Sequence, residues 1–179
     1  MSIPLYTPAE ARSRETFLAL MWAFSYPGRI YELPENDDPF RLVAETLLDL
    51  ETSCFTPDRA LEASISFTGA KTLDAQHAAY HFYPSLLPQY MPFIQQAHRG
   101  SMLYPDAAAT LIVGCEFGSG IPRTLTGPGI PREHTIQISG LDESFWDVRA
   151  TVCLYPLGWD IYLLDGRRVM GLPRSIRAK

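Results

Sequence analysis

Hydrophobic side chains recur at helical spacing near the start of the chain. Thr7-Pro8-Ala9-Glu10 has the form of a capping box with proline at the first helical position. The spacing that follows predicts an amphipathic helix of about four turns, ending at Ser25-Tyr26-Pro27-Gly28. We expect its apolar face to lie in the core, and that face consists of Phe17, Leu20, Met21 and Phe24.

A second helix is predicted from Asp38-Pro39, where a capping carboxylate again precedes a proline. Its apolar positions also recur every three or four residues, which is the spacing of one helix face. The residues expected to face inward are Leu42, Val43, Leu47 and Leu50.

The rest of the chain alternates between short β-type runs and helical stretches. The runs cover 51–56, 78–83, 109–116, 122–126 and 134–138, and the helical stretches lie near 58–66, 89–98 and 142–153. Two further runs, 159–164 and 167–172, flank Asp165-Gly166, a dipeptide that suits the two central positions of a hairpin turn. The pattern predicts one α/β domain over 1–179, with a mixed sheet flanked by helices, antiparallel at the last hairpin.

Composition narrows the class of protein. Apolar residues make up 46% and charged residues 20% of the 179 residues, which is typical of a folded globular domain. No apolar run reaches the roughly 18 residues of a membrane span, and the amino terminus lacks a basic segment followed by an apolar one. Three single cysteines without CxxC spacing favour reduced, buried thiols. We therefore expect a cytoplasmic protein without a membrane partner.

Charge is unevenly distributed. The net charge of −5 argues against a nucleic-acid partner, because binding to phosphate backbones needs clustered positive charge. Residues 167–179 nevertheless carry five cations and no carboxylate side chain: Arg167, Arg168, Arg174, Arg177 and Lys179. This basic segment is either a solvated tail or a site for a phosphorylated ligand or an acidic partner.

Few residues indicate catalysis or metal binding. His77 and His81 would share a face on a helix, but their surroundings read as a strand and no carboxylate completes a metal site. Gly118-Ser119-Gly120 lacks the third glycine of a nucleotide-binding loop and is predicted to form a hairpin turn. The segment 125–130, Leu-Thr-Gly-Pro-Gly-Ile, is either a simple turn or one whose exposed amides hold an anion. We expect no metal and no catalytic nucleophile.

Five segments in order resemble landmarks of the PhnH family, whose members are components of the bacterial carbon-phosphorus lyase system. They are FLALMWAFSYPGRI (17–30), AATLIV (108–113), LTGPGI (125–130), YPLGWDIYLL (155–164) and RVMGLPRS (168–175). The resemblance covers nearly the whole chain. It implies a fold similar to the large domain of pyridoxal-phosphate-dependent transferases, without that cofactor. Lys71, on a loop-like stretch, is an unpromising position for a Schiff base.

The resemblance also implies partners and a pathway. A PhnH-like protein is expected to join subunits G, I and J of the lyase system in a core complex, and to form a homodimer when isolated. The system transfers the triphosphoribosyl group of ATP to an alkylphosphonate with release of adenine. Three hypotheses stay open: a required, non-catalytic subunit; an enzyme that uses Asp160 and Arg174 as acid-base and charge-stabilising groups; and a regulatory module that binds a phosphorylated metabolite.

Two surfaces are candidates for binding. A phosphorylated small molecule or nucleotide would be held by backbone amides and by fork-shaped arginine donors, which predicts a site of Arg123, Gly127, Gly129, Asp160 and Arg174. Alternatively, Asp160 caps a turn and Arg174 ends the hairpin in solvent. Phe145 and Trp146 are either an interface centre or part of the core.

Overall fold

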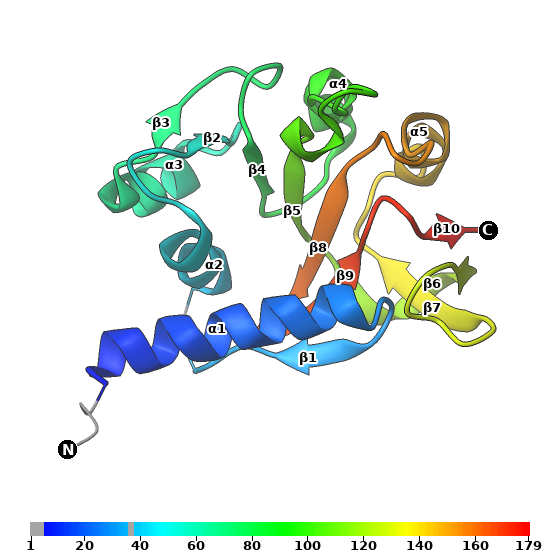
Figure 1. The fold of residues 1–179 in the computed structure, drawn as a ribbon, viewed down its shortest axis with the longest axis horizontal. Coiled ribbons are helices and arrows are strands. Elements are labelled where there is room, and N and C mark those ends of the chain that lie inside the picture. Colours follow the sequence, from blue (N-terminus) through cyan, green and yellow to red (C-terminus); the bar gives the residue numbers. More distant parts are fainter. Residues whose placement is uncertain (1–5, 36–37) are drawn as a thin grey trace.

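The computed structural model describes residues 6–35 and 38–179, which form one α/β domain (Figure 1). The helices are α1 (Pro8–Ser25), α2 (Pro39–Leu47), α3 (Arg59–Ile65), α4 (Met91–Gln96) and α5 (Phe145–Val152), with short 3-10 turns η1 (Ser66–Thr68), η2 (Pro88–Tyr90) and η3 (Pro105–Ala107). The strands are β1 (Ile30–Glu32), β2 (Ser53–Phe55), β3 (Lys71–Thr72), β4 (Tyr80–Tyr83), β5 (Thr110–Gly114), β6 (Glu116–Thr126), β7 (His134–Ser139), β8 (Asp160–Asp165), β9 (Arg168–Leu172) and β10 (Arg177–Ala178).

The main sheet is mixed, as the alternation of elements predicts. Its order is β1-β9-β8-β5-β4-β2-β3, and the neighbours from β8 to β3 run parallel. Strands β8 and β9 form the predicted antiparallel hairpin. Strand β1 also pairs with β9 in antiparallel orientation and forms one edge of the sheet. A separate antiparallel sheet of β10, β6 and β7 lies beside the main sheet and was not anticipated from the sequence (Figure 1).

Alternation along the central strands divides the core into two layers. Leu111 and Val113 of β5 face α4, α5 and the small sheet, whereas Ile112 between them faces α1, α2 and α3. Strand β8 repeats this pattern, with Ile161 on the first side and Tyr162 on the second. The main sheet is thus covered on both faces, which explains why its parallel strands are apolar almost throughout.

The predicted inner face of α1 is only partly correct. The capping box at Thr7 and Glu10 is present, and Leu20 is buried, but Phe17 and Met21 are 53% and 37% exposed. The small residues Ala19 and Ala23 face the sheet instead.

The cause is a close approach of α1 to β9. A Cβ at Gly171 would lie 2.5 Å from the carbonyl oxygen of Ala23, so helix and strand touch through their backbones. Large side chains do not fit in that contact.

Replacing Gly171 with Ala should therefore lower the free energy of unfolding by about 1.5 kcal/mol, because backbone atoms of α1 must move away from β9. Urea unfolding followed by circular dichroism measures the change. Gly166→Asn is the control, since a side chain at Gly166 meets open space and Asn tolerates positive φ. Equal stability of the Gly171→Ala variant and the parent would contradict the close contact.

Two predicted turns differ from the structure. The last hairpin turns at Gly166 and Arg167, one residue later than predicted, because Asp165 pairs with Arg168 and only Gly166 has positive φ (55°). Gly118-Ser119-Gly120 is not a hairpin turn but an irregular part of β6, between Phe117 and Pro122, where the register with β7 shifts. Glycine permits this local departure from the ladder.

Helix α2 begins at Pro39 with Asp38 as its cap, as predicted, and buries Leu42 and Val43. Leu50 was expected inside but is 74% exposed, because α2 ends at Leu47 before the spacing returns to its inner face. Within the described residues, no helix has both the length and the apolar character required to cross a membrane.

Candidate functional site

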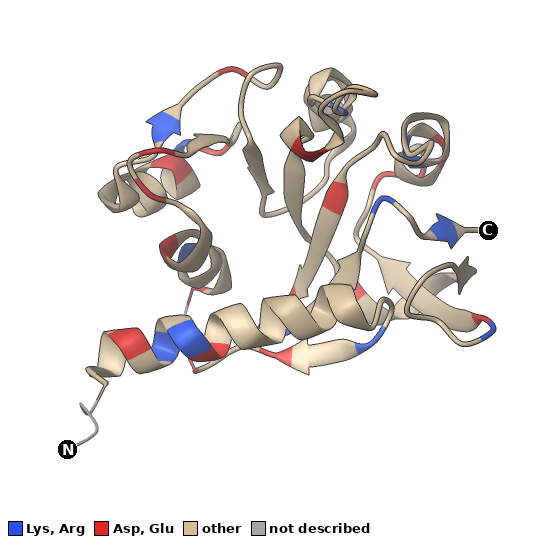
Figure 2. Cartoon of the chain, in the orientation of Figure 1, with Lys and Arg blue, Asp and Glu red and all other residues tan. Residues whose placement is uncertain are grey.

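Two hollows flank the basic carboxyl-terminal segment. The larger hollow, of about 810 Å³, is lined by Pro128, Cys153, Leu154, Tyr155, Arg174, Ser175 and Arg177. The smaller cavity, of about 260 Å³, is lined by Trp146, Arg149, Ala150, Cys153, Leu154, Ile176, Arg177, Ala178 and Lys179. They share Cys153, Leu154 and Arg177, so they lie on either side of one wall. Figure 2 shows basic positions on β10, on the loop before it and on the neighbouring helix α5.

Asp160 and Arg174 form a tightly connected ion pair. The Asp160 carboxylate accepts from the Arg174 backbone N–H at 2.9 Å and from its side-chain Nε and Nη2 at 3.2 and 2.5 Å. The remaining amino group of Arg174 donates to the carbonyl oxygen of Pro105. Arg174 is only 14% exposed, so the expectation that it ends the hairpin in solvent is wrong.

This pairing changes the chemistry open to both residues. Asp160 orients the side chain of Arg174, and both carboxylate oxygens of Asp160 already accept hydrogen bonds. The enzyme hypothesis requires Asp160 and Arg174 to act on a substrate as acid-base and charge-stabilising groups. Their engagement with each other and with Pro105 argues against that hypothesis.

The predicted turn at 125–130 does meet the segment that follows β9. Gly127 packs against Ser175 and Ile176, with a Cβ at Gly127 falling 3.0 Å from the Ser175 carbonyl oxygen, and Pro128 lines the larger hollow beside Arg174. Gly129 lies instead against Ser25 and Pro27 at the end of α1. The structure therefore brings Gly127 and Arg174 together and separates Gly129 from them.

Arg123 is placed apart from the larger hollow. Its guanidinium carbon lies 5.5 Å from the centre of the Trp146 ring, a cation–π arrangement. Its Nε is buried and has no hydrogen-bond partner among the described residues. Phe145 is completely buried, so the interface reading of Phe145 is wrong, whereas Trp146 is half-buried and lines the smaller cavity.

Arg149 is the functional candidate that sequence reasoning missed. It is 3% exposed, and its two amino groups donate to the carbonyl oxygens of Ile176 and Pro173, each at 3.0 Å. Burial lowers its pKa from the usual value, while Cys153 and Asp160 act in the opposite direction. The available signal was its position four residues after Phe145, which places both side chains on the inner face of α5.

The histidines and cysteines lie elsewhere or are inert. His77 is exposed and contacts Asp74 at 2.7 Å, whereas His81 is buried within β4, so the two do not share a face. No group of three or more metal-ligating side chains occurs in the ranges 6–35 and 38–179. Burial raises the pKa of Cys115 to about 12 and also raises that of Cys153, which disfavours the nucleophilic thiolate. Lys71 lies exposed on the short strand β3.

Comparison with known proteins gives two matches. A family model described as "Bacterial phosphonate metabolism protein (PhnH)" matches residues 5–179. A curated relative, "Putative C-P lyase subunit protein HtxG" from Stutzerimonas stutzeri, is 33% identical over 180 residues. That alignment covers 94% of this chain and 90% of the relative.

Proposed function

Because the chain belongs to the bacterial phosphonate metabolism family PhnH, we propose that it is a required, non-catalytic subunit of a carbon-phosphorus lyase complex. Its proposed partners are subunits G, I and J. The proposed reaction breaks the bond between adenine and ribose in ATP and joins the ribose carbon to a phosphonate oxygen, releasing adenine. In this reaction the chain contributes assembly and ligand binding, in the cytoplasm.

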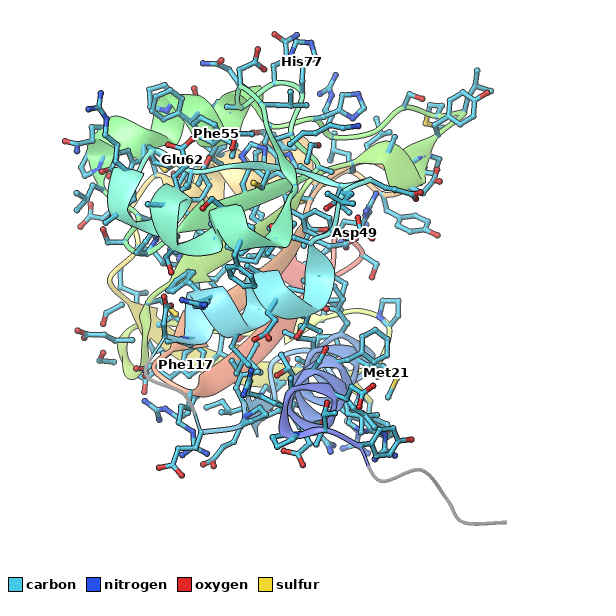
Figure 3. The ribbon with its side chains drawn as sticks, turned by 90° about the vertical axis from the view of Figure 1, so that its left-hand side faces the viewer. Met21, Asp49, Phe55, Glu62, His77 and Phe117 are labelled. Atoms are coloured by element: carbon cyan, nitrogen blue, oxygen red, sulfur yellow. The ribbon has the colours of Figure 1, made fainter. Side chains whose placement is uncertain are left out.

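The observation that carries the assembly role is an apolar surface on the outer side of α1. Phe17, Met21 and Trp22 are 53%, 37% and 43% exposed, and Tyr26 stacks on Trp22 with ring centres 5.6 Å apart. Met21 projects at the surface of α1 in Figure 3. Clustered aromatic and Met side chains are typical of interface centres. We assign this surface, called the α1 face, to a neighbouring subunit of the complex, since the curated relative is itself named as a lyase subunit.

A variant with Phe17→Ala and Trp22→Ala should lose at least about 90% of the subunits that co-purify with the parent from phosphate-starved cells, because interface aromatics carry much of the binding free energy. Quantitative mass spectrometry of the purified complex measures the loss. Phe67→Ala is a matched control, because Phe67 is 50% exposed on η1, outside the α1 face.

Full recovery of the neighbouring subunits by the double variant would overturn the assignment of the α1 face. The isolated chain is also proposed to form a homodimer, and sedimentation of the parent and the double variant measures that separately. Conversion of a dimer to a monomer, with the complex intact, would mean that a second copy and not another subunit covers α1.

The ligand-binding part of the proposal rests on the larger hollow. Arg177 and Ser175 supply donors there, and Pro128, Leu154 and Tyr155 supply apolar surface. Such a mixture suits a small molecule with a charged end and an organic body. The likeness to pyridoxal-phosphate-dependent transferases belongs to the same proposal, and the mixed sheet with helices on both faces supports it.

A further inference from the structure

The smaller cavity, between α5 and β10, concentrates positive charge. Three of its lining side chains are cations, Arg149, Arg177 and Lys179, and none of the side chains that line it is a carboxylate. The chain as a whole carries a net charge of −5. A cluster of one sign in a hollow of an oppositely charged protein attracts small ions of the other sign.

Arg149 is the buried cation among the residues that line this cavity. Its guanidinium is almost completely buried, and within residues 6–35 and 38–179 it makes no ion pair. Its amino groups donate only to two backbone carbonyl oxygens, and its Nε has no partner there. A buried cation is stable when an anion neutralises it, and carbonyl dipoles alone do so incompletely.

Strand β10 contributes the other two cations to the lining of the same cavity. Arg177 and Lys179 are two residues apart and both exposed, so their side chains leave the extended backbone on one side, whereas Ala178 between them packs against the core. The backbone here is held in place, because Arg177 is paired with Thr126 and Lys179 exchanges two hydrogen bonds with Thr124, at 2.8 and 3.0 Å. The backbone positions from which the two side chains extend are therefore set before any ligand arrives.

A fourth cation, Arg123, lies next to the aromatic residue of the cavity lining, Trp146. Trp146 lines the cavity, and Arg123 on the neighbouring strand β6 lies over its ring. Asp160, a carboxylate whose charge acts on Arg149, is engaged by Arg174 and does not line the cavity. The remaining ionisable wall residue, Cys153, has its pKa raised by burial.

We propose that the cavity between α5 and β10 binds the phosphate or phosphonate group of a small molecule, held by Arg149, Arg177 and Lys179. Arginine forks and a lysine ammonium suit the oxygens of a tetrahedral phosphorus anion. The adjoining larger hollow, beyond the shared wall of Leu154 and Arg177, takes the organic part of the same molecule. The inference deepens the proposed function and rests on it for the class of ligand.

Isothermal titration of the isolated full chain with inorganic pyrophosphate, and separately with methylphosphonate, tests the site at one fixed ionic strength. The parent should bind one equivalent of pyrophosphate. The double variant Arg177→Gln with Lys179→Gln should bind at least about tenfold more weakly, because it loses two charge-assisted contacts. Arg149→Lys, which keeps the charge but removes the fork, should also weaken binding.

A charge-matched control distinguishes specific binding of pyrophosphate in the cavity from nonspecific attraction of the anion to positive charge. Arg59→Gln with Lys71→Gln removes the same charge from exposed positions on α3 and β3 and should bind as the parent does. Equal weakening in both double variants, or no pyrophosphate binding by a folded parent, would overturn the proposal. Both exposed pairs can be replaced without disturbing the core, so the result does not depend on whether the Arg149 variant folds.

Failure of this site is distinguishable from failure of the proposed function. Binding is measured on the isolated chain, whereas assembly is measured by co-purification through the α1 face. Loss of one with retention of the other identifies which proposal is wrong.

Discussion

Replacing Arg174 with Ala is expected to lower the free energy of unfolding by about 3 kcal/mol, because the change leaves Asp160 as a largely enclosed carboxylate without its cation. The same change also removes the donor to the Pro105 carbonyl oxygen. Urea unfolding of the variant measures the effect. Arg177→Ala is a matched control: Arg177 is exposed and should change stability by less than about 0.5 kcal/mol.

A double-mutant cycle with Asp160→Ala isolates the ion pair. The two single variants should each be destabilised, and the double variant should be less destabilised than their sum, because removing both charges leaves neither unpaired. If the changes in unfolding free energy of the two single variants simply add up in the double variant, the ion pair contributes nothing to stability. A growth defect of Arg174→Ala cells on phosphonate therefore says little about ligand binding, since loss of stability alone can lower abundance.

Acidification from pH 8 to pH 5 is expected to remove about 2 kcal/mol of folding stability through His81 alone. Burial lowers the pKa of His81 from 6.5 to about 4. Its ring is fully enclosed, lies beside Phe55 and contacts the Tyr83 hydroxyl through Nδ1 at 3.0 Å. Between those pKa values the unfolded chain takes up a proton that the folded chain does not, so stability is present above pH 6.5 and falls as the pH falls toward 4.

The difference in unfolding free energy between parent and His81→Phe, measured at several pH values, isolates this contribution. The variant should lack the steep loss between pH 7 and pH 5, whatever its stability at neutral pH. His77→Gln is the control, because His77 is exposed and should leave the pH dependence in place. Parallel curves for parent and His81→Phe would mean that His81 has the same pKa in the folded and unfolded chains.

Capping residues in the sequence predicted where helices begin more accurately than hydrophobic spacing predicted which side of a helix is buried. The capping residues Thr7 and Asp38 start two helices where the sequence places them, because a cap depends on only four neighbouring residues. The inner face of α1 depends instead on Gly171, a residue about 150 positions later in the chain whose missing side chain admits Ala23. Nothing near Phe17 in sequence reveals that contact.

The candidate site was predicted in part for the same reason. Turn chemistry identified the segment 125–130, and charge identified the basic carboxyl-terminal segment, which meet at the larger hollow. The burial of Arg149 and the pairing of Arg174 depend on which strands become neighbours, and composition carries no information about that. An arginine in a short helix reads as a surface residue until the helix has a partner.

The pairing of β1 with β9 has a consequence for how the protein is made. Residues 30–32 find their strand partner only at 168–170, and α1 rests on that same late strand. Contacts between such distant segments slow folding. During synthesis, the small-residue side of α1 and the edge of β8 that pairs with β9 stay uncovered until residues 168–172 leave the ribosome. A nascent chain in this state is a substrate for chaperones, and a truncation before β9 leaves it there permanently.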